Sequence, residues 1–142
     1  DKDHIWIFFI EAEPACGQLG GAGTSSAAVL PANDPRGLVG EQMIPYCPNE
    51  GLDNRPPCGW VGGFGHELGH AFGLPHPPGC DYGSSSCDSP ALMWAGFRDY
   101  PDTYLRLDER DQLENTPFFS SLKVSAKKFN CNNFGGLGSA NR

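Results

Sequence analysis

The stretch His66–His76 reads HELGHAFGLPH and is the most informative part of the chain. His66 and His70 are four residues apart, and positions four apart on an α-helix lie on one face. The spacing therefore predicts a helix that presents two imidazoles to a single metal ion. Zinc suits this pair because it binds neutral imidazole nitrogen at about 2.0–2.1 Å and tolerates an open fourth position. Glu67 lies beside the first histidine, where its carboxylate can take a proton from water at the metal.

The second half of the stretch supplies a third histidine. We expect the helix to run from about Gly63 to Gly73, because glycine tolerates the positive φ that ends a helix and turns the chain back. Pro75 then stiffens the approach of His76, which would bind the metal from outside the helix. Three histidines plus one water form a catalytic zinc geometry, whereas a structural zinc ion is enclosed by four protein ligands.

These residues carry a resemblance to a known family. His66–His76 matches the metzincin signature HExxHxxGxxH at all five fixed positions. Metzincins also have a methionine turn beneath the metal, and Met93, which follows His76 by 17 residues, resembles it. The resemblance covers roughly Gly62–Trp94. Pro77, the residue after the third histidine, matches neither the adamalysin-like enzymes nor most matrix metalloproteinases, so no subfamily is assigned.

The resemblance implies a secreted zinc-dependent endopeptidase that acts on peptide or protein substrates. One catalytic zinc ion would be held by His66, His70 and His76, with Glu67 as general base and Met93 in a structural role. The implied fold is α+β, with a small twisted mixed sheet packed on the active-site helix. An irregular C-terminal subdomain with a final helix would follow, so that residues 1–73 form an upper subdomain and 74–142 a lower one.

Two alternatives stay open at this point. One is a non-catalytic zinc-binding module related to metzincins, whose hallmark would be loss of the general base; Glu67 is present. The other is a fragment that needs a partner segment for activity. Only 65 residues precede His66, fewer than metzincin catalytic domains usually have, which favours a minimal domain, a missing N-terminal segment or a second chain.

The flanking sequence predicts further elements. Ile5–Ile10 is β-branched and aromatic throughout, which predicts a strand buried on both faces. Thr24–Leu30 is expected to form a second strand, and the resemblance makes it the rim of a cleft to which an extended substrate adds by β-augmentation. Asn33–Gly37 is rich in turn residues, Asp108 can cap a final helix over Asp108–Glu114, and Ala95–Tyr104 is expected to form the wall of a substrate pocket.

Six cysteines indicate disulfides and therefore a compartment outside the reducing cytosol. Six cysteines allow 15 pairings, and the sequence alone does not choose among them. Short separation favours Cys47–Cys58 and Cys80–Cys87, which leaves Cys16–Cys131 to join the two ends. The alternative is that the cysteines are buried free thiols.

Composition excludes several other classes of protein. The chain has 142 residues, which suits one domain, and 17 acidic against 10 basic residues give a formal net charge of −7. Without a basic cluster, neither nucleic acid nor an anionic membrane is an expected partner. The longest apolar run, Ile5–Ile10, is far shorter than the roughly 20 residues of a spanning helix. No signal peptide is present, so we expect a mature or excised product.

Overall fold

The computed structural model describes residues 4–12, 20–39 and 57–119, which have an α+β architecture. The strands of this part are β1 (Trp6–Ile10), β2 (Ala22–Thr24) and β3 (Ala27–Pro31). Its helices are α1 (Asn33–Val39), α2 (Pro57–Ala71) and α3 (Leu107–Glu114), joined by the 3₁₀ turns η1 (Cys80–Tyr82) and η2 (Ala95–Asp99). The predicted α+β class with a small sheet is thus confirmed, and the division into subdomains 1–73 and 74–142 stays a prediction.

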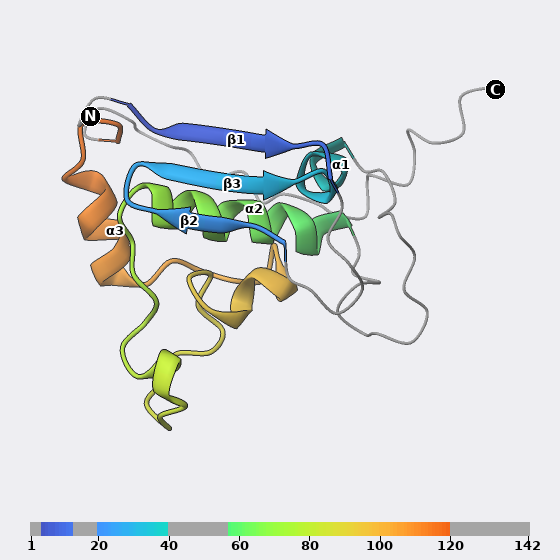
Figure 1. Cartoon of the computed structure of the whole chain (residues 1–142). Helices are drawn as coiled ribbons and strands as arrows, with labels where there is room; N and C mark the ends of the chain where they lie inside the picture. Colours follow the sequence, from blue (N-terminus) through green and yellow to red (C-terminus); the bar gives the residue numbers. More distant parts are fainter. Residues whose placement is uncertain (1–3, 13–19, 40–56, 120–142) are drawn as a thin grey trace, which may run out of the picture.

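The sheet is mixed, and its strands are arranged in the order β1-β3-β2 (Figure 1). β1 runs parallel to β3, with Trp6 opposite Ala27 and Ile10 opposite Pro31. β2 runs antiparallel to β3, with Gly23 opposite Ala28. β3 is therefore the central strand, and β2 forms an edge of the sheet within the described residues.

The prediction of one strand over Thr24–Leu30 is wrong. A turn at Ser25 and Ser26 divides the segment, so that Thr24 ends β2 and the rest belongs to β3. Ser26 has a φ of 75°, a left-handed conformation that serine rarely adopts. Because this turn contains no glycine, proline or asparagine, it lacks the residues that ordinarily indicate a hairpin.

The core lies between the sheet and α2, which runs beneath it (Figure 1). Ala28 and Leu30 on β3 are fully buried. Phe9 on β1, which is paired with Leu30, stacks on Phe64 of α2 with ring centroids 6.2 Å apart. Since side chains alternate along a strand, one face of the sheet packs on the helix and the other points away from it.

The prediction that Ile5–Ile10 is buried on both faces is also wrong. β1 is an edge strand of the described sheet, and even Phe9, on the face that meets Phe64, is 55% exposed. On the outer face, Trp6 and Phe8 are 58% and 51% exposed. Their rings stack on each other at 6.4 Å. An apolar run predicts a strand, but it does not determine whether that strand lies at the centre or at the edge of the sheet.

Helix α2 begins at Pro57, six residues before the predicted start at Gly63. In the sequence, the glycines of this segment suggest a loop. In the structure, they let other segments approach the helix closely. A Cβ at Gly62, for example, would lie 2.0 Å from the carbonyl oxygen of Phe97. The helix N-terminus was therefore missed because the glycines serve tertiary packing, at a cost of about 0.5–1 kcal/mol each in helix propensity.

The predicted chain reversal at Gly73 is confirmed. α2 ends at Ala71, and Gly73 has a φ of 90°. The N–H of Gly73 donates to the carbonyl of His70 at 2.8 Å, and the N–H of Leu74 donates to that of Gly69 at 3.0 Å. These two bonds satisfy carbonyls at the end of the helix, as in a glycine-terminated C-cap.

Two smaller predictions need correction at the remaining helices. The final helix is present as α3, but Asp108 does not cap it; the carboxylate of Glu109 instead accepts the N–H of Arg106 at 2.8 Å. The turn predicted at Asn33–Gly37 is helix α1, with a proline in its first turn, where the missing N–H has no cost.

The Cys80–Cys87 disulfide is present as predicted. Cys58 is also disulfide-bonded, whereas the predicted partner Cys47 and the pair Cys16–Cys131 lie outside the described residues. These bonds fit an extracellular protein. None of the helices in the described ranges has the length and apolar character to cross a bilayer.

Candidate metal centre

Three histidines converge at the C-terminal half of α2, as their spacing predicts. His66 and His70 lie on one face of the helix, and the reversal at Gly73 carries His76 back to them. The Nε2 atom of His70 lies 3.1 Å from that of His66 and 3.2 Å from that of His76. One ring nitrogen from each histidine falls within 4.8 Å of the others, so the three residues could hold a metal ion.

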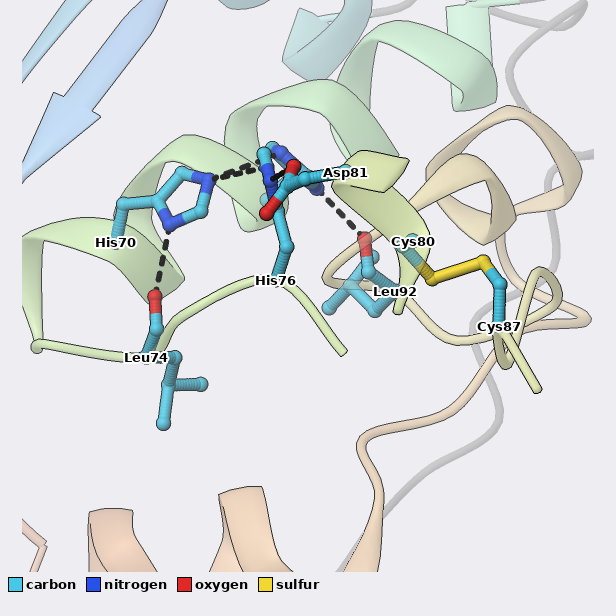
Figure 2. A network of polar contacts seen from close by, with 8 residues as sticks. His70, Leu74, His76, Cys80, Asp81, Cys87 and Leu92 are labelled. Carbon is cyan, nitrogen blue, oxygen red and sulfur yellow. Dashed lines mark hydrogen bonds and ion pairs between the residues drawn. A yellow bond between two sulfur atoms is a disulfide. The ribbon is translucent and has the colours of Figure 1, made fainter. Parts of the chain in front are cut away.

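The opposite ring nitrogen of each histidine is held by an oxygen. Nδ1 of His66 donates to the carbonyl of Leu92, and Nδ1 of His70 donates to that of Leu74, both at 2.8 Å. Nδ1 of His76 lies 2.6 Å from a carboxylate oxygen of Asp81 (Figure 2). A main-chain carbonyl is only an acceptor, so the first two Nδ1 atoms must carry the proton.

This arrangement fits a cation at the point where the rings meet. A neutral imidazole protonated at Nδ1 has an unprotonated Nε2 with a lone pair. The lone pairs of the three rings then face one another without a proton between them, which is unfavourable unless a positive charge lies there. Metal-bound histidines commonly show this pattern, with the metal on one nitrogen and a carbonyl or carboxylate on the other.

The pKa values of the helix histidines favour the neutral, ligating form. Burial lowers the pKa of His66 to about 4, because desolvation outweighs the bond to Leu92, and the neighbouring imidazoles lower it further. Burial also lowers the pKa of His70, against the opposing bond to Leu74. Both rings are therefore neutral at pH 7, as metal binding requires.

Glu67 lies beside the cluster, between α2 and strand β2. Burial raises the pKa of its carboxyl to about 7, with the nearby His76 and a hydrogen bond from the N–H of Gly23 acting in the opposite direction. A Cβ at Gly23 would lie 2.5 Å from the carbonyl oxygen of Glu67 and from Cβ of His70. Only glycine therefore allows the edge strand to come this close to the residues of the cluster.

Met93 packs beneath the same turn of α2. Its side chain is fully buried, and a Cβ at Gly69 would lie 2.3 Å from its sulfur. The preceding residue, Leu92, supplies the carbonyl that holds His66, and its own N–H donates to the carbonyl of Tyr104 at 2.8 Å. The segment that contains Met93 therefore supports the histidines through both packing and a hydrogen bond.

We expect Gly69→Ala to destabilise the protein by about 1–2 kcal/mol. Overpacking against Met93 costs about 1–3 kcal/mol, and the better helix propensity of alanine offsets up to about 1 kcal/mol. Gly65→Ala is the matched control, because its Cβ would meet Leu92 at an ordinary 3.7 Å. Urea unfolding of the metal-free proteins measures both changes. A Gly69→Ala variant as stable as the Gly65→Ala variant would contradict the packing of Met93 against the helix.

A small cavity adjoins the cluster on the side of Glu67. It has a volume of about 90 Å³ and is lined by Gly20, Asp34, Trp60, Gly63, His66, Glu67 and Phe97. Phe97 belongs to the segment Ala95–Tyr104, from which a pocket wall was predicted, and its ring centroid lies 5.3 Å from that of His66. A larger groove of about 620 Å³ lies at the C-terminal end of α2, next to Phe72 and Phe118, and none of the three histidines lines it.

The structure adds site residues that the sequence analysis missed. The carbonyls of Leu74 and Leu92 carry no side-chain signal, because every residue has one. Gly23 has no side chain, so nothing in the sequence pointed to its contact with Glu67. Asp81 was missed although it is an acidic residue five positions after the third histidine, which is the one signal that could have pointed to it.

Comparison with known proteins adds no further information on the site. No protein-family model, no curated protein and no solved structure matches this chain. The interpretation of the three-histidine cluster therefore depends on its geometry and chemistry.

Proposed function

We propose that the protein is a zinc-dependent endopeptidase, with zinc held by His66, His70 and His76. The observation that carries the proposal is the convergence of three Nε2 atoms whose Nδ1 partners are all oxygen acceptors, next to the carboxylate of Glu67. Tetrahedral zinc at about 2.0–2.1 Å from each nitrogen separates the nitrogens by about 3.4 Å, close to the Nε2 separations of 3.1 and 3.2 Å that His70 makes with His66 and His76. The metzincin signature in His66–His76 supports the same assignment.

Three protein ligands leave one coordination position open, which is the pattern of catalytic rather than structural zinc. Bound zinc would supply Lewis acidity and would lower the pKa of water to about 7. Glu67 would act as general base, because its carboxylate lies beside the cluster and can accept a proton from the attacking water. The same carboxyl would then donate the proton to the leaving amine. The hydrogen bond from the N–H of Gly23 would hold this carboxylate in a fixed orientation.

We further propose that an extended substrate adds to strand β2 (Ala22–Thr24). This replaces the rim predicted at Thr24–Leu30, most of which is the central strand β3 and has strands on both sides. β2 is at the sheet edge in the described part of the chain, and Gly23 contacts both Glu67 and His70. A peptide hydrogen-bonded along β2 would therefore pass the cluster in an extended form. The cavity at Phe97 would receive one of its side chains.

Secretion is part of this proposal. The Cys80–Cys87 disulfide favours an oxidising compartment, where an endopeptidase would meet protein substrates. The alternatives remain a non-catalytic zinc-binding module and a fragment that needs a partner segment. Glu67 in its position beside the cluster supports the enzyme over the module.

Metal removal tests the proposal. The purified protein should contain about one zinc per chain and should hydrolyse casein. A chelator such as 1,10-phenanthroline should abolish hydrolysis, and one equivalent of zinc should restore it. Native mass spectrometry of the same sample detects any second chain. Zinc binding without hydrolysis would favour the non-catalytic module, and hydrolysis that persists in the zinc-free protein would refute the zinc mechanism.

A further inference from the structure

The third histidine is held differently from the other two. Rigid main-chain carbonyls hold His66 and His70, and both histidines belong to helix α2. His76 lies on the loop after the helix, its side chain is 30% exposed, and its Nδ1 contacts a side chain, the carboxylate of Asp81, at 2.6 Å (Figure 2). The position of this ring therefore depends on where the loop places Asp81.

Asp81 lies next to a disulfide. Asp81 lies in the 3₁₀ turn η1, immediately after Cys80, whose bond to Cys87 closes the loop (Figure 2). Cys80 is 3% exposed, its N–H donates to the carbonyl of Pro77, and its own carbonyl accepts the N–H of Gly83. The residue next to Asp81 is thus buried, bonded and cross-linked, although the Asp81 side chain itself is 56% exposed.

We propose that Asp81 is the positioning residue for the third metal ligand, and that the Cys80–Cys87 disulfide holds it in place. The inference rests on the proposed metal site. The carboxylate keeps the proton of His76 on Nδ1, so that Nε2 faces His70 with its lone pair. A carboxylate partner also makes the imidazole a more basic ligand, and loss of such partners typically weakens metal binding by about 10–100-fold.

A neighbouring acid provides the matched control. Asp88 follows the disulfide by one residue, but its carboxylate accepts the hydroxyl of Tyr104 at 2.5 Å rather than a histidine. Loss of the Asp88 carboxylate should therefore leave the metal ligands unaffected. If removing a negative charge from this part of the chain has a general effect on zinc affinity, variants at Asp81 and at Asp88 should both show it.

The test is the affinity for zinc, measured by competition with a chromophoric chelator, together with the visible spectrum of the Co²⁺-loaded protein. Asp81→Ala should weaken zinc binding about tenfold or more and change the Co²⁺ spectrum. Asp81→Asn should recover part of the affinity, because its amide oxygen can still accept the proton of His76. Asp88→Asn should bind zinc as the wild type does. Thermal unfolding of the metal-free forms should be similar for the Asp81 and Asp88 variants.

A double-mutant cycle tests the role of the disulfide. In a Cys80→Ala/Cys87→Ala protein, Asp81→Ala should cost less affinity than in the wild type, because the carboxylate is no longer held beside His76. Equal zinc affinity and spectra for wild type and Asp81→Ala would refute the role of Asp81. An undiminished effect of Asp81→Ala without the disulfide would refute the role of the disulfide.

The zinc affinities also distinguish failure of this inference from failure of the proposed endopeptidase function. A wild-type protein that binds zinc but cleaves no peptide would contradict the endopeptidase, while the Asp81 affinities would still decide the positioning role. A wild-type protein that binds no zinc would refute both.

Discussion

Glu67→Gln is expected to lower peptide hydrolysis by roughly 10²- to 10⁴-fold while zinc stays near one per chain. Glutamine has the same shape as glutamate, and its amide oxygen can still accept the hydrogen bond from Gly23. It cannot accept a proton from water, so only the proposed general-base step is lost. The histidines and their oxygen partners are unchanged, which is why the metal content should not fall.

Glu109→Gln is the control for this substitution. Glu109 is also a buried glutamate that accepts a backbone N–H, and burial raises its pKa too. It lies on α3 and binds none of the three histidines, so its loss should leave the rate of casein hydrolysis near the wild-type value. A Glu67→Gln variant that cleaves casein as fast as the Glu109→Gln variant would contradict the general-base assignment.

His76→Ala is expected to weaken zinc binding by more than about 100-fold and to remove activity with it. The substitution reduces the protein ligands from three to two, a larger change than the loss of an outer partner, which costs about 10–100-fold. The fold should persist, because His76 lies in a loop after α2 and is only half-buried. Zinc quantification after dialysis, with casein hydrolysis on the same sample, measures both effects.

The fourth histidine of the chain is the control for His76→Ala. His4 precedes β1 and is not one of the three residues that converge, so His4→Ala should keep the metal and the activity. If His76→Ala instead retains zinc near one per chain and remains active, His76 is not a ligand. If both variants lose zinc equally, the loss is not specific to the cluster.

The three-histidine cluster was predictable because its geometry is mostly local. Helical hydrogen bonding places residues four apart on one face, which determines how His66 and His70 relate wherever the helix lies. Gly73 ends the helix within three residues of the second histidine, and only two residues separate it from His76. The chain has little freedom over so short a connection. The short Cys80–Cys87 loop was predictable for the same reason.

The sheet was predicted less well because its order depends on contacts between distant segments. The apolar run at Ile5–Ile10 predicted a strand, which is present as β1. Its place at the edge depends on which strands pair with it, and nothing within the run determines that. The turn at Ser25 and Ser26 was missed because serine indicates a turn more weakly than glycine or asparagine does. Ser26 has a positive φ, and its N–H donates to the carbonyl of Ala71 at the end of α2.

The start of α2 was predicted too late in the sequence. Five glycines between Gly59 and Gly69 lower helix propensity, so the helix was predicted to begin late. In the folded chain Gly62 accommodates Phe97 and Gly69 accommodates Met93, and these close contacts explain why glycine is present. Propensity is a weak local preference, and burial of neighbouring segments overrides it.

The sequence by itself determined the candidate ligands, the acid beside them and the reversal that brings His76 back, because each follows from spacing along a few residues. Only the tertiary structure decided what surrounds them: the carbonyl of Leu92 at His66, the carboxylate of Asp81 at His76, and β2 rather than β3 as the edge beside Glu67. Each of these contacts either joins segments that are distant in the sequence or involves atoms of a loop. Their energies come from packing and hydrogen bonds that no local spacing encodes.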